Sequence, residues 1–225
     1  MIEYKLVQTN RKTVSIKIKK DTTVEVRAPN NISKAQIDEI VKSRENWIKE
    51  HLEKVKKEHD QRKKFNLNFG DYVLIRGNKK QICSTNKNIA SYEDNKFLIP
   101  EFCNNDQIKE IIINLYKMIA KEHILSRVIH FKEEMNVEPT GFRITSAKTR
   151  WGSCSGKNSI NFTWKLVMAD DEIIDYVVVH ELSHIKEHNH SKNFWKEVEK
   201  IIPDYNVKKE KLKDLQYKLN TENWE

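Results

Sequence analysis

The chain has 225 residues, of which 41 are basic and 33 acidic, giving a formal net charge of +8. It can bury about 70–75% of its unfolded surface, enough for one large domain or two small ones. No run of 18 or more apolar residues is present and the N-terminus lacks a signal-peptide core, so we expect neither a transmembrane helix nor a membrane partner. Three widely spaced cysteines predict no disulfide framework and no zinc-binding cysteine pair, which favours a cytoplasmic protein.

The sequence of the N-terminal third predicts short strands followed by a long helix. Strands are expected at residues 3–8, 13–19 and 23–27, the second because Val14, Ile16 and Ile18 alternate with polar residues. Ser33 is a suitable N-cap for a helix over about 33–62. We expect this helix to bury Trp47 and Ile48 on its apolar side.

The densest basic run lies late in this helix, at residues 54–64. It is most simply the solvated face and frayed end of the helix, because acidic residues are interspersed. A patch that binds nucleic acid or another polyanion is the alternative.

The middle of the chain predicts more strands and a second long helix. Strands are expected at 72–75 and, as several short pieces, within 81–99, and a helix at about 105–135. Pro100 marks a boundary between an N-terminal α+β region, 1–100, and a C-terminal region, 101–225. The predicted fold class is therefore α+β.

Further short strands are expected after this helix. Strands are predicted at 142–145 and 160–166, with a tight bend at Trp151–Ser153 because Gly152 permits unusual dihedrals. If the 160–166 strand lies at an exposed sheet edge, it could pair with an extended peptide.

The stretch His180-Glu181-Leu182-Ser183-His184 is the most informative part of the sequence. Asp170 or Asp171 is the expected N-cap of a helix that continues through this stretch. Residues four apart lie on one helix face, so His180 and His184 can aim two imidazoles at one point. Glu181 then lies beside a metal-bound water, in the H-E-x-x-H arrangement of zinc metallopeptidases.

A catalytic zinc takes three protein ligands plus water, so a third ligand is needed. His188 would stay on the face of a continuing helix and stack above His184. Asn189 tolerates the left-handed conformation that ends helices, and Ser191 can cap a new helix. His190 then lies at the corner where the chain turns back, and we favour it over His188.

Several sequence blocks spread over nearly the whole chain match one known family. They are Arg11–Ile18, Val24–Pro29, Arg150–Ser155, Asn161–Leu166, Asp175–His184, Asn189–Trp195 and Pro203–Tyr205. In these blocks the sequence resembles the YgjP-like metallopeptidases, relatives of the SprT-like and WLM proteases. The resemblance implies a zincin-like region with an active-site helix against a small sheet, Zn²⁺ on His180, His184 and His190, and Glu181 as general base. A metzincin is disfavoured, because Glu187 replaces the glycine of that motif and no methionine follows the histidines.

Some choices stay open at this stage. A peptide or protein substrate is expected, but a hydrolase of nucleotide phosphoanhydrides and a nucleic-acid-associated protein with a structural metal site are alternatives. Arg150, Tyr176 and Tyr205 are candidates for stabilising an oxyanion, and their spacing does not choose among them. A structural ion pair is an equal alternative for Arg150, and packing beside the histidine helix is the alternative for Tyr176. Cys154 is interpreted as a small structural thiol, since a metal already supplies the nucleophile.

Overall fold

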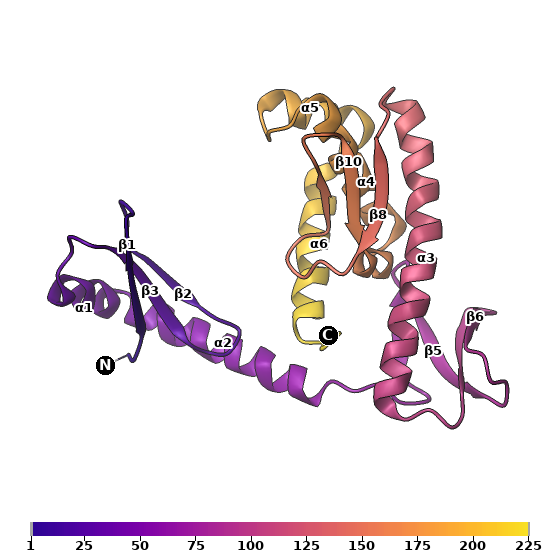
Figure 1. Cartoon of the computed structure of the whole chain (residues 1–225), viewed down its shortest axis with the longest axis horizontal. Helices are drawn as coiled ribbons and strands as arrows, with labels where there is room; N and C mark the ends of the chain where they lie inside the picture. The colour runs from indigo at the N-terminus through magenta and orange to yellow at the C-terminus, as the bar shows by residue number, and fades with distance from the viewer. Residues whose placement is uncertain (1, 225) are drawn as a thin grey trace. The chain divides into compact units, whose positions relative to one another are not determined.

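The computed structural model describes residues 2–224 and has a mixed α+β architecture, which confirms the predicted fold class (Figure 1). It forms two compact units. The first is the chain up to Phe65 with Lys218–Asn223, and the second is Asn66–Tyr217 with Trp224. The strands between residues 72 and 100 belong to the second unit, while the predicted domain division after residue 100 stays a prediction. Within residues 2–224, no helix combines the length and hydrophobicity needed to cross a membrane.

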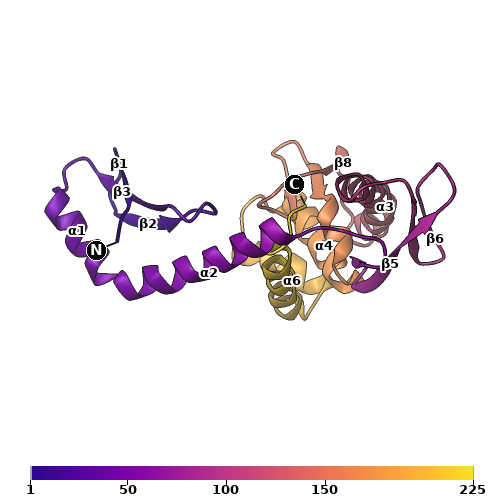
Figure 2. The same ribbon diagram turned by 90° about the horizontal axis from the view of Figure 1, so that it is seen from below.

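The first unit is a three-stranded sheet with two helices on one face (Figure 2). The central strand β3 pairs in parallel with β1 and antiparallel with β2. The elements are β1 (Lys5–Thr9), β2 (Ser15–Ile18), β3 (Val24–Pro29), α1 (Lys34–Ser43) and α2 (Glu45–Lys64). Because strand side chains alternate between faces, every second residue of β3 enters the core with residues of both helices. These core residues are Val24, Val26, Ala28, Ile37, Val41 and Ile48.

The predicted single helix over 33–62 is wrong, because the structure divides it in two at Arg44. Arg44 has φ −107° and ψ 12°, and its N–H bonds back to the carbonyls of Val41 and Lys42. Ser33 caps α1 as predicted, in a capping box with Gln36. Ile48 is fully buried as expected, but Trp47 is 40% exposed. Adjacent helix residues point about 100° apart, so directing Ile48 at the sheet turns Trp47 away.

The second unit begins with a four-stranded sheet packed on one long helix. The strand order is β4–β5–β7–β6, with β5 and β7 parallel. The elements are β4 (Tyr72–Ile75), β5 (Asn78–Thr85), β6 (Ser91–Glu93), β7 (Lys96–Pro100) and α3 (Asn105–Glu134). Helix α3 confirms the predicted helix over 105–135, and Asn104 and Gln107 form its capping box. Tyr116 of α3 is fully buried and donates a hydrogen bond of 2.7 Å to the Leu74 carbonyl, which ties the helix to β4.

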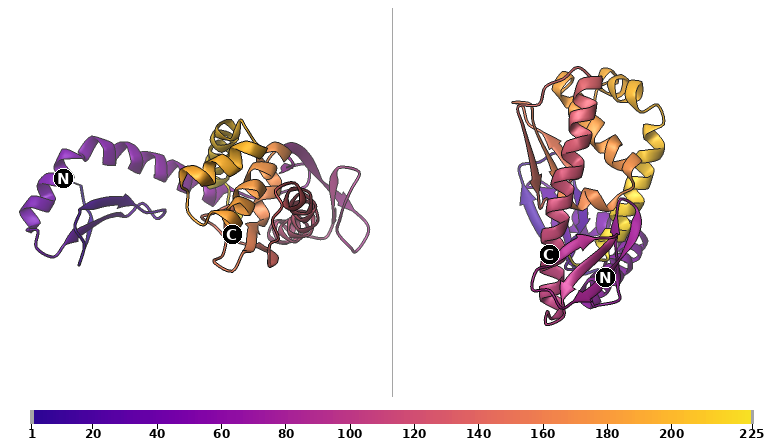
Figure 3. Two further views of the ribbon diagram at one scale, coloured as in Figure 1. Left: turned by 90° about the horizontal axis from the view of Figure 1, so that it is seen from above. Right: turned by 90° about the vertical axis from the view of Figure 1, so that its right-hand side faces the viewer.

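A second sheet in this unit supports the helix that carries the histidines. Its order is β8–β10–β9, and α4 lies on one side of it (Figure 3). The elements are β8 (Gly141–Thr145), β9 (Gly152–Cys154), β10 (Ser159–Thr163), η1 (Trp164–Met168), α4 (Asp171–Lys186), α5 (Lys192–Ile201) and α6 (Tyr205–Asn220). Ile160 and Phe162 of β10 are buried, and their cross-strand partners on β9 are Cys154 and Gly152.

Two predictions about this sheet are wrong. Of the tight bend predicted at residues 151–153 only Trp151 lies in a bend, and Gly152–Cys154 is a strand that pairs antiparallel with β10. The strand predicted over 160–166 ends at Thr163, where the chain enters a 3₁₀ helix. This strand is central rather than an edge, because β8 and β9 occupy its two sides. The edge strand that packs on α4 is therefore β9.

Candidate metal centre

Helix α4 starts where its sequence favours a helix start. Asp170 is the N-cap, as predicted, and Asp171 and Glu172 occupy the first turn near the positive end of the helix dipole. Asp171 also forms a two-point ion pair with Arg76, at 2.6 Å from Nε and 2.5 Å from Nη2. The start of α4 is thus held against the loop after β4.

The end of α4 sets the direction in which the chain leaves. The helix ends at Lys186, and the next residue, Glu187, is extended with φ −134° and ψ 97°. The left-handed residue expected at Asn189 is not found, so that prediction is wrong. The Asn189 side chain instead accepts a hydrogen bond of 3.0 Å from the Ser191 N–H. Ser191 caps α5 as predicted, by accepting from the Phe194 N–H.

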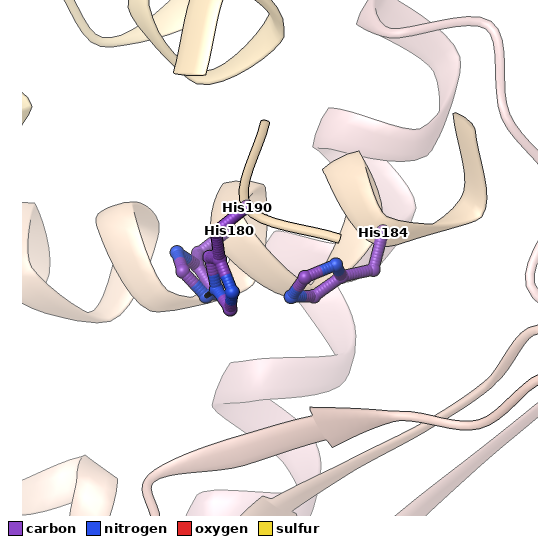
Figure 4. Close-up of side chains that lie close together, drawn as sticks. All are labelled: His180, His184 and His190. Carbon is purple, nitrogen blue, oxygen red and sulfur yellow. Dashed lines mark hydrogen bonds between the residues drawn. The ribbon is translucent and has the colours of Figure 1, made fainter. Parts of the chain in front are cut away.

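This turn brings His190 back to the two histidines of α4 (Figure 4). The nitrogens of His180, His184 and His190 that can bind a metal all lie within 4.8 Å of one another. The Nε2 atoms of His180 and His190 are 3.1 Å apart. His188 does not belong to this group, and its side chain is exposed. The structure therefore brings together the three histidines that the sequence favoured.

A buried aromatic ring supports all three imidazoles. Phe194 is fully buried, and its ring centroid lies 4.9 Å from that of His180, 4.5 Å from His184 and 4.7 Å from His190. No sequence pattern indicates this role. The helical spacing of Phe194 signals only a buried position.

Burial favours the neutral form of the two imidazoles on α4, which is the form that binds metals. Burial lowers the pKa of His180 to about 3, with smaller contributions from His184, His190 and Lys209. Burial also lowers the pKa of His184. The Nδ1 atom of His184 lies 3.0 Å from the Glu187 carbonyl, which can only accept, so Nδ1 carries the proton and Nε2 keeps a free lone pair.

The geometry and the donor types fit a divalent transition metal. In a tetrahedral site with zinc–nitrogen bonds of about 2.05 Å, two ligand nitrogens lie about 3.3 Å apart. The 3.1 Å between the Nε2 atoms of His180 and His190 is close to this value. His190 is exposed, so the side of the site that it forms is open to solvent. Imidazole ligands suit zinc, copper, iron and nickel rather than calcium or magnesium.

The carboxylate of Glu181 lies in a tight pocket beside β9. Glu181 is only 5% exposed, and a Cβ built on Gly152 would meet its Cγ and Oε1 at 2.6 Å. The Cys154 N–H donates a hydrogen bond to the carboxylate, while Oε2 is buried with no hydrogen-bond partner among the described residues. Burial raises the pKa of Glu181 to about 8, although Arg150 and the Cys154 N–H act in the opposite direction. A buried oxygen without a partner is costly unless the site supplies one.

The other candidates named from the sequence lie at different places around the site. The buried Tyr176 ring is 5.9 Å from the His180 ring, and burial raises the pKa of its hydroxyl to about 12, so it stays protonated. Tyr205 stacks at 5.0 Å on Trp195, whose ring lies 5.8 Å from that of His180. Arg150 is near enough to lower the pKa of Glu181.

Cys154 is a half-buried free thiol in β9. Its pKa is raised by burial and by the charge of Glu181, which keeps the thiol protonated and poorly nucleophilic. These surroundings support a structural rather than a nucleophilic role.

Residues 12–215 of the sequence match the family model of the YgjP-like metallopeptidase domain. The chain belongs to the YgjP-like metallopeptidase family. Membership supports a metallopeptidase that uses a metal ion and acts on peptide or protein substrates.

Two solved structures are similar to part of the chain, and both are metallopeptidase zymogens. Abylysin of Pyrococcus abyssi is 27% identical over 44% of this chain and 97% of its own, with a TM-score of 0.39. Jannalysin of Methanocaldococcus jannaschii is 26% identical over 41% of this chain and 94% of its own, with a TM-score of 0.36. No curated protein matches the sequence.

Proposed function

We propose that the protein is a zinc-dependent peptidase in which His180, His184 and His190 hold the metal and Glu181 is the general base. The observation that supports this most strongly is the convergence of three imidazoles on one point, next to a buried carboxylate. A structural zinc site is closed by four protein ligands, whereas a catalytic site uses three and keeps one position for water. Among residues 2–224, three histidines and no fourth side chain form the group.

The proposed chemistry assigns a separate task to each residue. A bound zinc ion polarises a carbonyl and lowers the pKa of water toward about 7. Glu181 accepts the proton of the attacking water and donates it to the leaving amine. Its partnerless Oε2 is the atom available for this transfer. The free carboxyl has a pKa of about 8, and positive charge at the imidazole site favours the ionised form that a base requires.

The substrate is proposed to bind along the outer edge of β9. This strand pairs with β10 on one side only, and its Gly152 and Cys154 lie against Glu181. An extended peptide that adds to this edge would make backbone hydrogen bonds beside the carboxylate. The exposed edge at which a peptide could pair is therefore that of β9 and not that of residues 160–166.

The test combines metal analysis with a substrate panel. The purified protein should contain about one zinc per chain, lose activity on chelation and regain it with zinc. A mixed peptide panel should show new amino termini with wild type. Glu181→Gln should lower kcat by at least about 10²–10⁴-fold, the range for a lost general acid–base group. Glu199→Gln, which changes an exposed glutamate of α5, is the matched control and should keep wild-type activity.

Two results would contradict the proposal. Turnover of nucleoside triphosphates but not of any peptide would indicate the phosphoanhydride hydrolase. Unfolding on chelation, with no turnover of peptide or nucleotide, would indicate a structural metal site.

A further inference from the structure

The positive charge of the chain is concentrated in the N-terminal unit. Residues 1–65 contain 17 basic and 10 acidic side chains, a net charge of +7. Residues 66–225 contain 24 basic and 23 acidic side chains, a net charge of +1. The stretch of sequence that carries the candidate metal centre, residues 66–225, is therefore almost neutral. The excess positive charge belongs to residues 1–65, which contribute no residue to the proposed chemistry.

Within this unit, the sheet has two faces of opposite character. The inner face carries the apolar residues that pack on α1 and α2 (Figure 2). The strand register places the alternate residues on the other face, where Glu25 has Lys5 as its neighbour on β1 and Lys17 on β2. In the same way Arg27 is flanked by Val7 and Ser15. We call this the outer face, and it comprises Lys5, Val7, Thr9, Ser15, Lys17, Glu25 and Arg27 with the adjoining Arg11 and Lys19.

The outer face is basic because its single acidic residue is already neutralised. Glu25 is 3% exposed, with Lys19 at 2.5 Å from one oxygen and Arg27 at 2.8 Å from the other. These contacts lower the pKa of Glu25 to about 2. Arg11 donates to the Ser15 hydroxyl at 3.0 Å, which places its guanidinium at the same face. Lys19 and Arg27 thus neutralise the carboxylate of Glu25, while Lys5, Lys17 and Arg11 lie at the same face without a carboxylate partner from it.

The exposed cations lie close enough to act together. Lys5 and Lys17 are exposed and flank Glu25 on opposite strands, so their backbones are about two strand spacings, roughly 9.6 Å, apart. This distance is about one Debye length at 0.1 M salt, so a polyanion would meet their combined field.

The chemistry of the outer face selects among polyanions. A protein partner would need an aromatic or aliphatic anchor. Among the described strand positions of this face only Val7 and Pro29 are apolar, and Pro29 is buried. Single-stranded nucleic acid is bound largely by stacking on aromatic rings, and none of these residues is aromatic. Lysine, arginine, serine and threonine are the side chains that contact phosphate groups.

We propose that the outer face of the β1–β3–β2 sheet binds the phosphodiester backbone of double-stranded nucleic acid, without reading its sequence. This inference concerns a different surface from the metal centre and does not depend on the proposed peptidase chemistry. It also differs from the patch considered in the sequence analysis, since the dense run at 54–64 lies on α2, which packs on the opposite face.

The test measures binding of the full-length protein to a fluorescent 20-base-pair duplex of mixed sequence by anisotropy at several salt concentrations. Each phosphate contact contributes about 0.9 to the slope of log K against log salt. The double variant Lys5→Gln/Lys17→Gln should therefore reduce the slope by about 1.8, and weaken binding similarly for unrelated duplex sequences. The matched control, Lys56→Gln/Lys57→Gln, removes the same charge from exposed positions of α2 and should change the slope by less than half as much.

Several outcomes would overturn the inference. Equal slope changes in the two double variants would show that only the total charge of the unit matters. Tighter binding of a single strand or of polyglutamate than of the duplex would assign the surface to another partner. Absence of duplex binding by the wild type at 50 mM salt would remove the basis of the proposal. Circular dichroism of each variant confirms that the comparison is between folded proteins.

Discussion

Replacing Gly152 by alanine tests whether the position of Glu181 matters for catalysis. The added Cβ would lie 2.6 Å from both Cγ and Oε1 of Glu181 and 2.8 Å from Cδ. Non-bonded carbon atoms prefer about 3.5–4.0 Å, so one partner must move by roughly 1 Å. Strand β9 is held by its pairing with β10, whereas the contacting atoms of Glu181 belong to its side chain. The carboxylate is therefore the group that we expect to shift.

The expected effect on activity is larger than the effect on stability. Misplacing a reacting group by about 1 Å can cost about 10²-fold in rate, so kcat should fall by at least about this factor. Overpacking of a well-packed site costs about 1–3 kcal/mol, which for a chain of this size lowers Tm by about 2–12 °C. Zinc content should not change, because the three atoms nearest to the added Cβ all belong to Glu181.

The assay measures peptide hydrolysis, zinc content and thermal unfolding on the same preparations. Gly156→Ala is the matched control, because a Cβ at that position meets no atom within 4 Å. It should behave as wild type in all three measurements. Wild-type kcat in Gly152→Ala would refute the argument that Glu181 must occupy this pocket. Loss of zinc from Gly152→Ala would show that the substitution acts on the histidines instead.

Three other predictions concern the metal ligands, their support and the N-terminal sheet. His190→Ala should lower zinc affinity strongly in a competition titration, whereas His188→Ala should leave it unchanged; equal effects would contradict the assignment of the third ligand. Phe194→Ala removes a fully buried ring, so it should destabilise the protein by about 3–5 kcal/mol in denaturant and also weaken zinc binding; loss of stability with unaltered zinc affinity would refute its supporting role. The pKa of Glu25 is lowered to about 2, so its ionised form stabilises the fold above the unfolded pKa of about 4.3, and this contribution is lost as pH falls toward 2. The difference in Tm between wild type and Glu25→Gln should therefore be constant above about pH 5 and shrink below it; a difference that grows on acidification would contradict the ion pairs.

The sequence predicted best those features that depend on local signals. Asn104 and Ser33 are good N-caps followed by glutamine at the third helical position, and both helices begin where these residues indicate. The division of α1 from α2 carries no comparable signal. Arg44 is an ordinary helix former, and residues on both sides of the break, Val41 and Ile48, enter the same core with β3.

In the candidate site, too, contacts within one helix could be predicted from the sequence, and contacts between distant segments could not. His180 and His184 come together because the period of one helix places residues four apart on one face. The close approach of Gly152 to Glu181 joins segments 29 residues apart, so no spacing in the sequence indicates it. A glycine after a tryptophan was interpreted as a bend, although its function in the structure is to leave room for a carboxylate.

The position of His190 depends on a helix end that the sequence places only approximately. Had α4 continued by one more turn, His188 would have followed His184 on the same face and His190 would have pointed elsewhere. The helix instead ends at Lys186, and the Glu187 carbonyl, freed from helical bonding, lies against Nδ1 of His184. The same residue thus orients one ligand and begins the turn that delivers another. Extending the helix, for example with Glu187→Ala and Asn189→Ala together, should therefore weaken zinc binding without removing any ligand.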